Sequence, residues 1–174
     1  ILQLSDADLF AELGLEEQIQ QALEPEYTMP SGAELVFEQT KALVSVDVNS
    51  KSFLGSADGS MEDTALQVNL EAARLIPSQL RLRNLGGIVV IDFIDMLDRN
   101  HNFKVEKRLK DHLKNDRARV QVGRISNFGL LELSRQRLKV NEDSKVSIKC
   151  SHCNGYGRIP SNHFLINQLT RVFE

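Results

Sequence analysis

Residues 41–50 read KALVSVDVNS, and residues 88–94 read IVVIDFI. In the first stretch Val44, Val46 and Val48 alternate with polar residues, which is the two-residue period of a strand with one buried face. The second stretch is a nearly continuous apolar run, which predicts a strand that is buried on both faces. These two strands and the helical patterns around them predict an α/β (α+β) fold in which a mixed β-sheet is flanked by helices.

Outside these two stretches, strand and helix patterns follow one another along most of the chain. Gly14 is expected to break the first helix, and Pro77 is expected to kink or restart the second. Further strands are predicted at 33–39, 117–125 and 128–133, and helices at 6–24, 61–83, 102–115 and 162–173. We predict two domains, a larger part at 1–140 with an acidic N-terminal helix and a small C-terminal part at 141–174.

The composition of the 174 residues limits the class of protein. No run of about 18 apolar residues occurs, so we expect no membrane span. The chain begins at Ile1 without a methionine, so we expect a fragment, and a removed leader stays an open alternative. Two cysteines close together argue against a disulfide framework. A reducing compartment is therefore expected, the cytoplasm or, after removal of a transit peptide, a plastid.

Charge is distributed unevenly along the chain. The first hundred residues hold 17 acidic and 6 basic residues, a net charge of −11, whereas the remainder sums to +8. Such asymmetry predicts an anionic ligand near the second half, although the two halves could also neutralise each other within the fold. The basic segment 104–124, with Arg135 and Arg137, is the candidate track for phosphate groups.

Two aspartates interrupt the apolar strands. Asp47 and Asp92 each lie in a valine- or isoleucine-rich stretch, and Asn49 shares a strand face with Asp47. A buried carboxylate needs a partner, a metal ion or a proton. Carboxylates on neighbouring strands can hold one hard cation, and Mg²⁺ prefers few carboxylates together with water. The alternative is that each aspartate pairs with an arginine or caps a loop.

The C-terminal motif CSHCNGYG at 150–157 contains both cysteines of the chain. A closed structural zinc site needs four ligands, so Cys150 and Cys153 supply only half of one. Two alternatives stay open from the residues alone. The pair could be a redox couple, or it could be one unit of a zinc region like that of DnaJ-type chaperones, which use several such units.

Several stretches together resemble the ribonuclease E/G family of bacterial and plastid endoribonucleases. They are ALVSVDVNS, NLEAARLIPSQLRLRNLGGIVVIDFIDM, LKNDRARVQVGRISNFGLLELSRQRL and CSHCNGYG, in unbroken order over residues 26–158. The resemblance implies a catalytic subdomain like DNase I and cleavage of single-stranded RNA that leaves a 5′-phosphate. The usual barrel, 5′-end sensor and ribonuclease H-like domain of the family do not fit into this chain. It is therefore either an excised catalytic region or a reduced relative.

The resemblance also implies roles for individual residues. Asp47 and Asp92 match two aspartates that bind Mg²⁺, and Asn49 matches an asparagine that orients the scissile phosphate. Cys150 and Cys153 match a pair that shares one Zn²⁺ with the same pair of a second subunit, which implies a homodimer or a higher homo-oligomer.

RNA contacts are expected in the second half of the chain. By the same resemblance, Arg119 matches an arginine that contacts the 5′-monophosphate of the substrate. The neighbouring Arg117 and Arg124 are further candidates for phosphate contacts. Phe128 could stack a base, or it could be a core residue of its strand. Two other functions stay open: a zinc-linked dimeric module that binds RNA or protein without cutting, and a phosphodiesterase that acts on DNA.

Overall fold

The computed structural model describes residues 9–51, 60–137, 150–153, 155, 157–164 and 166. Its contacts divide the chain into two units, residues 1–138 and residues 139–174. Among the described helices, none combines the length and the apolar character that crossing a lipid bilayer requires.

The first unit is built on a six-stranded mixed sheet with the order β1-β2-β3-β4-β6-β5. All neighbouring strands are antiparallel except β3 and β4, which are parallel. The strands are β1 (Glu26–Thr28), β2 (Glu34–Gln39), β3 (Leu43–Asn49), β4 (Gly87–Asp92), β5 (Val120–Ile125) and β6 (Leu130–Arg135). The predicted fold class is therefore confirmed, and its parallel pair joins the two aspartate-bearing strands.

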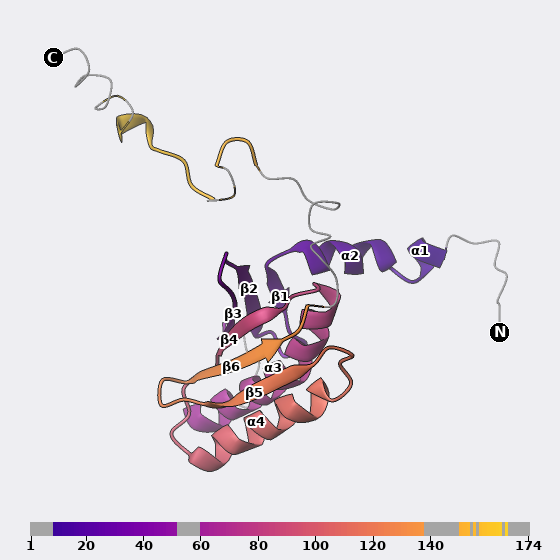
Figure 1. Ribbon diagram of the computed structural model, residues 1–174, viewed down its shortest axis with the longest axis vertical. Coiled ribbons are helices and arrows are strands. Elements are labelled where there is room, and N and C mark those ends of the chain that lie inside the picture. The colour runs from indigo at the N-terminus through magenta and orange to yellow at the C-terminus, as the bar shows by residue number, and fades with distance from the viewer. Residues whose placement is uncertain are drawn as a thin grey trace. The chain divides into compact units, whose positions relative to one another are not determined.

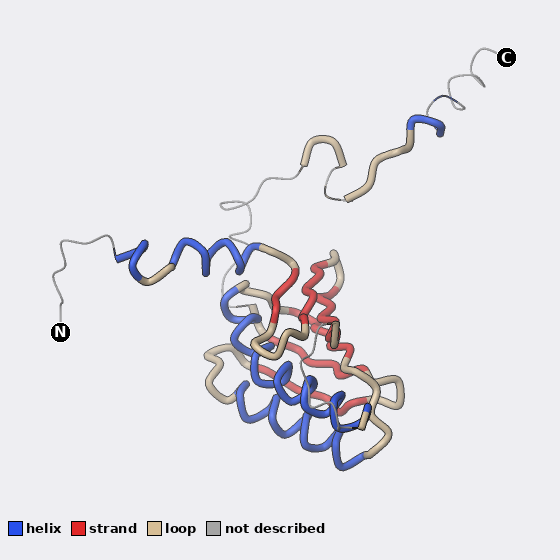
Figure 2. Tube along the Cα trace, turned by 180° about the vertical axis from the view of Figure 1, so that it is seen from behind, coloured by secondary structure: helices blue, strands red, loops and turns tan. Residues whose placement is uncertain are grey.

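Two long helices cover one face of this sheet. They are α3 (Met61–Leu82), which provides the crossover from β3 to β4, and α4 (Arg99–Leu113). In Figure 1 the strands lie in front of both helices, and in Figure 2, from behind, both helices lie in front of the strands. The buried core between the layers includes Val46, Ile91 and Leu131 from the sheet and Ile76 and Leu109 from the helices.

The structure corrects two details of the predicted elements. α3 runs without interruption through Pro77, so the expected restart there is wrong. β4 is not buried on both faces: Val89 and Ile91 are buried, but Ile88 is 55% exposed. The physical reason is that both helices pack on the same side, which leaves the other side of β4 uncovered by any described element.

The N-terminal helix is broken at Gly14, as predicted. Gly14 has a φ of 56°, a left-handed conformation that favours glycine, and it separates α1 (Leu9–Glu12) from α2 (Leu15–Leu23). The end of α2 is fixed to α3, because the Arg83 guanidinium donates hydrogen bonds to the carbonyl oxygens of Gln21 and Glu24.

The second unit is described only in part. Residues 150–153 form a turn, and residues 162–164 and 166 are helical. The remainder of the predicted C-terminal helix lies outside the described residues.

Candidate functional site

Asp47 and Asp92 lie directly opposite each other on the parallel strands β3 and β4. In β3 the valines on either side of Asp47 are buried, so strand alternation places its carboxylate on the open face of the sheet. Asp92 is the last residue of β4 and is likewise exposed, next to the buried Ile91. Two residues 45 positions apart in the sequence are thereby brought side by side at one edge of the open face.

The electrostatics of this pair are those of uncompensated negative charge. Loss of hydration raises the pKa of Asp92 above its ordinary value, and the charges of Asp47 and Asp95 raise it further. Among the described residues, neither Asp47 nor Asp92 has an arginine or lysine partner. The alternative that each aspartate pairs with an arginine is therefore not what the structure shows.

Asn49, the last residue of β3, contacts Asp47. Its Nδ2 atom donates a hydrogen bond of 2.7 Å to Oδ2 of Asp47. The two residues share a strand face because they are two positions apart. The bond fixes one oxygen of Asp47 and leaves its other oxygen available to a cation.

Gly129, in the turn between β5 and β6, approaches the carboxylates closely. A Cβ atom at this position would lie 3.0 Å from Oδ1 of Asp95, 3.2 Å from the carbonyl oxygen of Phe93 and 4.0 Å from Oδ1 of Asp92. Its φ of +76° also favours glycine. Glycine therefore lets this turn pack against the segment that follows Asp92. The sequence alone gave no sign of this role for Gly129.

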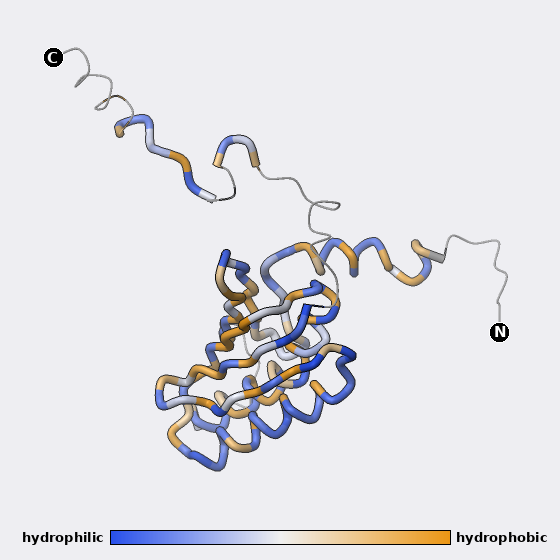
Figure 3. The backbone as a smooth tube through the Cα atoms, viewed as in Figure 1, coloured by the Kyte–Doolittle hydropathy of each residue, from blue (hydrophilic) through white to orange (hydrophobic). Residues whose placement is uncertain are grey.

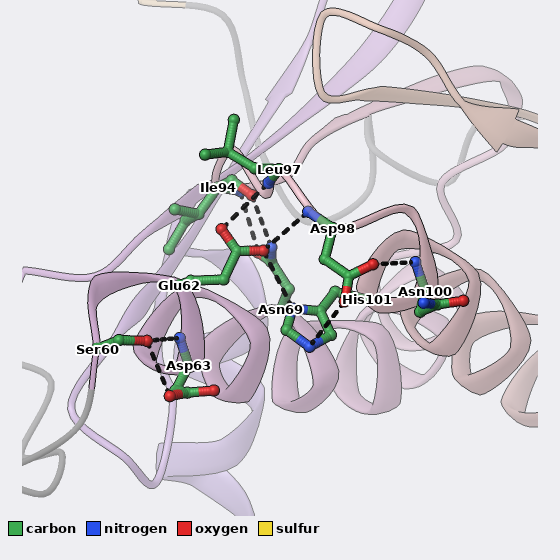
Figure 4. A network of polar contacts seen from close by, with 9 residues as sticks. All are labelled: Ser60, Glu62, Asp63, Asn69, Ile94, Leu97, Asp98, Asn100 and His101. Atoms are coloured by element: carbon green, nitrogen blue, oxygen red, sulfur yellow. Dashed lines mark hydrogen bonds and ion pairs between the residues drawn. The ribbon is translucent and has the colours of Figure 1, made fainter.

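The segment after Asp92 is held in place by α3, as Figure 4 shows. Asn69 is fully buried and makes two hydrogen bonds to the backbone of Ile94: its Nδ2 donates to the carbonyl oxygen (2.8 Å), and its Oδ1 accepts from the N–H (3.0 Å). Glu62 accepts from the N–H groups of Leu97 and Asp98, both at 3.1 Å. These bonds fix the path of the chain immediately beyond Asp92.

His101 and Asp98 complete this network. The Nδ1 atom of His101 lies 3.0 Å from Oε1 of Glu62, and Asp98 accepts a hydrogen bond from the N–H of Asn100 at the start of α4. The backbone N–H groups of Leu97 and then Asp98 are the main causes of a lowered pKa of Glu62. Sequence reasoning missed Asn69 and Glu62, although a polar residue at a helix position that faces the core was a usable signal.

The predicted RNA-binding residues lie on the surface of the first unit. Arg117 and Arg119 lie just before β5 and Arg124 lies within it, and all three are exposed. Phe128 is 82% exposed, so the alternative that it is a core residue is wrong. Figure 3 shows that the hydrophilic colour predominates along α4, which carries the basic segment. On one side of α4 the basic side chains Lys104, Lys107 and Arg108 line a shallow depression.

Arg135 does not belong to this basic surface, which corrects the prediction. It is only 3% exposed, and its guanidinium makes hydrogen bonds of 2.8 and 3.2 Å to the carboxylate of Asp116. A third bond of 2.6 Å reaches the carbonyl oxygen of Leu85. Arg135 is a structural cation that ties the end of β6 to two loops. Arg137 is exposed, and its Nε donates to the carbonyl oxygen of Gly86.

Cys150 and Cys153 lie together in the turn of the second unit, and both are free thiols. Hydrogen bonds from the backbone of Cys153 and His152, and from the Cys153 side chain, lower the pKa of the Cys150 thiol. This surrounding favours the thiolate form, which is the form that binds zinc. Two sulfur donors that can form thiolates could supply half of a tetrahedral Zn²⁺ site.

The open-face carboxylates fit a different ion. Within the part of the chain that the structure describes, no group of three or more His, Cys, Asp or Glu side chains could enclose a metal ion. Two neighbouring carboxylates with spare oxygens leave several positions to water and phosphate, which is the arrangement that Mg²⁺ prefers. A divalent cation would also relieve the repulsion that raises the pKa of Asp92.

Comparison with known proteins points in one direction. The model of the "Ribonuclease E/G family" matches residues 1–138. "Ribonuclease E" of Haemophilus influenzae is 44% identical over 169 residues, 97% of this chain and 18% of that protein. "Ribonuclease G" of Escherichia coli is 37% identical over 164 residues, 94% of this chain and 32% of that protein. "Ribonuclease E/G-like protein, chloroplastic" of Arabidopsis thaliana is 40% identical over 151 residues, 87% of this chain and 15% of that protein. The chain thus spans a third or less of these relatives.

Proposed function

The chain belongs to the ribonuclease E/G family, and from this premise we propose that it is the metal-binding core of an endoribonuclease that cleaves single-stranded RNA and leaves 5′-phosphate ends. The observation that carries the proposal is the register of β3 and β4, which places Asp47 opposite Asp92 on the open face of the sheet. The raised pKa of Asp92 supports it, because an unneutralised carboxylate cluster is what a cation site presents before the ion binds.

Asp47 and Asp92 would hold Mg²⁺ between them. When bound, Mg²⁺ supplies Lewis-acid stabilisation of the charge that develops on the scissile phosphate and makes a water molecule more acidic. Asn49 keeps one oxygen of Asp47 fixed through its 2.7 Å hydrogen bond, and its amide would be the donor that orients a non-bridging oxygen of the scissile phosphate. Attack by water on phosphorus breaks the bond to the 3′ oxygen, so the products are a 3′-hydroxyl and a 5′-phosphate.

Preference for RNA has to come from binding, because attack by water does not use the 2′-hydroxyl. Arg117, Arg119 and Arg124 on β5 and the segment before it, together with the basic side of α4, offer a positive surface for the phosphates. We expect the affinity for RNA to fall steeply with salt concentration, because bound phosphates release counterions.

Zn²⁺ belongs to the second unit in this proposal. Cys150 and Cys153 supply two thiolates, and the same two residues of a second copy of the chain complete a tetrahedral site. The proposed partners are therefore single-stranded RNA and a second copy of the chain. Free thiols are compatible with a reducing compartment, the cytoplasm or a plastid.

A cleavage assay tests the catalytic proposal. The 174-residue chain is incubated with a 5′-monophosphorylated single-stranded oligonucleotide, with and without Mg²⁺. We expect Mg²⁺-dependent cleavage that Asp47→Asn and Asp92→Asn each reduce by about a thousand-fold, the factor that a loss of about 4 kcal/mol in transition-state stabilisation implies.

The matched control is Glu132→Gln, which removes an exposed carboxylate from the same sheet on the neighbouring strand β6. It is expected to cleave at the unchanged rate. Cleavage by either aspartate variant at the rate of the unchanged chain contradicts the proposal. A chain that binds RNA but does not cleave it favours the zinc-linked binding module instead.

A further inference from the structure

A cavity of about 590 Å³ opens beside the carboxylates. It lies between the segment that follows β4, one side of α4, and the end of β5 with the turn that leads to β6. Its apolar surface comes from residues of all three parts, including Ile94, Met96, Phe103 and Ile125. This volume falls within the usual range for cavities that hold small ligands.

The cavity shares parts of its wall with the metal-binding pair. Asp95 and Gly129 both line it. The charge of Asp95 acts on Asp92, and a Cβ atom at Gly129 would lie 4.0 Å from Oδ1 of Asp92. Asp92 itself does not line the cavity, but a ligand bound against Asp95 and Gly129 would lie close to it.

Basic side chains outnumber acidic ones in the lining of this cavity by three to two, and the acidic ones are Asp95 and Glu106. Arg99, Lys110 and Arg124 line it, and among the described residues Arg99 and Arg124 have no ion-pair partner. Lys110 is different, because its Nζ atom lies 3.6 Å from Oε2 of Glu106. The wall thus offers two guanidinium groups, which bind phosphate through paired N–H groups.

An aromatic ring is exposed at the same place. Phe103 lines the cavity and is still 65% exposed, although it lies in the same helix as fully buried residues such as Leu109. Amide and hydroxyl groups of Asn102, Asn127 and Ser126 lie among the apolar atoms. An exposed ring, scattered hydrogen-bonding groups and guanidinium groups are together the usual surroundings of an unpaired base and its phosphate.

We propose that this cavity is a subsite for one unpaired nucleotide adjacent to the scissile phosphate, with the base against Phe103 and the phosphate on Arg99 and Arg124. The inference rests on the proposed function and deepens it. A base must leave a helical stack before it can enter the cavity, so the subsite selects single-stranded RNA over duplex. Phe128 lies in the turn between β5 and β6 but does not line the cavity, so its ring is not part of this subsite.

The experiment measures RNA binding in the absence of divalent metal, so that cleavage does not contribute. Fluorescence anisotropy follows the 174-residue chain with single-stranded oligonucleotides in which one abasic nucleotide is placed at each position in turn. In the unchanged chain one position is expected to lower affinity at least about five-fold, the lower end of a single stacking contribution. Phe103→Leu should lower affinity for the intact RNA similarly and should abolish the extra cost of that one abasic position. Phe103→Tyr, which keeps an aromatic ring, should still show the extra cost of that abasic position.

Arg124→Ala is expected to weaken binding and to reduce its dependence on salt, since one phosphate contact is lost. Arg81→Ala, an exposed arginine at the end of α3, is the matched control and should change neither. The subsite is overturned if the cost of abasic positions is the same in Phe103→Leu as in the unchanged chain. If that equal cost is found and the unchanged chain still cleaves RNA with Mg²⁺, the subsite alone is refuted. If Phe103→Leu does abolish the cost of the one abasic position but the unchanged chain does not cleave RNA with Mg²⁺, the catalytic proposal alone is refuted.

Discussion

At the scale of single residues, the central feature is a carboxylate that is costly to keep ionised. Asp92 lies opposite Asp47 and near Asp95, and burial and both charges raise its pKa. Natural strands rarely place two like charges side by side, because directly opposed like charges destabilise a sheet. The pairing of Asp47 with Asp92 is therefore explained better by the binding of a ligand than by a contribution to folding stability.

We predict that Asp47→Asn lowers the pKa of Asp92 toward its ordinary value, since it removes one of the two repulsive charges. A titration of the Asp92 carboxyl carbon by NMR measures this, with Glu132→Gln as a control that should leave the value unchanged. The pKa of Asp92 is higher in the folded chain than in the unfolded chain. The free energy of unfolding therefore falls as the pH rises from the unfolded pKa through the folded pKa. Asp92→Asn is accordingly expected to raise the melting temperature at neutral pH. An unchanged pKa in Asp47→Asn would show that the two carboxylates do not interact.

The residues that carry the candidate site could be identified in part from the sequence. Asp47 and Asp92 were visible because each interrupts an apolar strand, and Asn49 because it shares a face with Asp47. Gly129 and Phe103 were not, because their importance comes from contacts between distant segments. Arg135 was misassigned as a phosphate-binding residue, since sequence cannot show that Asp116 lies within hydrogen-bonding distance.

At the scale of elements, the important contact is between α3 and the segment after β4. Asn69 replaces the hydrogen bonds that Ile94 would have made in a longer strand, and Glu62 does the same for Leu97 and Asp98. The segment carries Asp95 and forms one wall of the cavity. α3 therefore positions groups around the site that it does not itself contact.

We predict that Asn69→Ala destabilises the chain by about 2 kcal/mol or more, because it leaves the N–H and carbonyl groups of Ile94 without partners. Urea unfolding measures the loss, with the exposed Gln67→Ala as a control on the same helix. Faster hydrogen exchange at the Ile94 amide should accompany it. If the exchange rate at Ile94 stays the same, Asn69 does not hold this segment.

A dependence on pH is expected for Glu62. Its pKa in the folded chain lies below the unfolded value of about 4.3, so its stabilisation is complete above that value and is lost as the pH falls through the folded pKa. Glu62→Gln should therefore lower the melting temperature at pH 7 and change it much less near pH 3. Thermal unfolding across this range checks the prediction, and an equal effect at both pH values would contradict it.

Most elements could be predicted because their periodic patterns are strong and their ends carry glycine or polar residues. The break at Gly14 and the alternation in β3 are examples. The continuous helix through Pro77 could not, because buried contacts on both sides of the proline outweigh its local preference. The exposed side of β4 could not either, since sequence does not show on which side the helices pack.

At the scale of the whole molecule, the sheet has one face covered by α3 and α4 and one face that no described element covers. The candidate site lies at an edge of this open face. The chain corresponds to a third or less of the relatives compared above. Its proposed activity, RNA contacts and assembly therefore need direct measurement on the chain itself.

A further prediction concerns assembly through zinc. Zinc content and molar mass measured on the same sample should give one Zn²⁺ per two chains for a dimer. Cys150→Ser should remove the zinc and shift the mass toward that of a single chain, because two thiolates of the site are lost. His163→Gln, outside the cysteine motif, is the control. One zinc ion per chain, or a dimer that persists without zinc, contradicts the shared site.

The central claim is that Asp47 and Asp92 together bind one divalent cation. Binding of Mn²⁺, a spectroscopically visible substitute for Mg²⁺, tests this most directly in the metal-free chain with both cysteines changed to serine. We predict one site per chain that either Asp47→Asn or Asp92→Asn weakens at least ten-fold and that Glu132→Gln leaves unchanged. Mn²⁺ affinity that survives the loss of both aspartates would contradict the account.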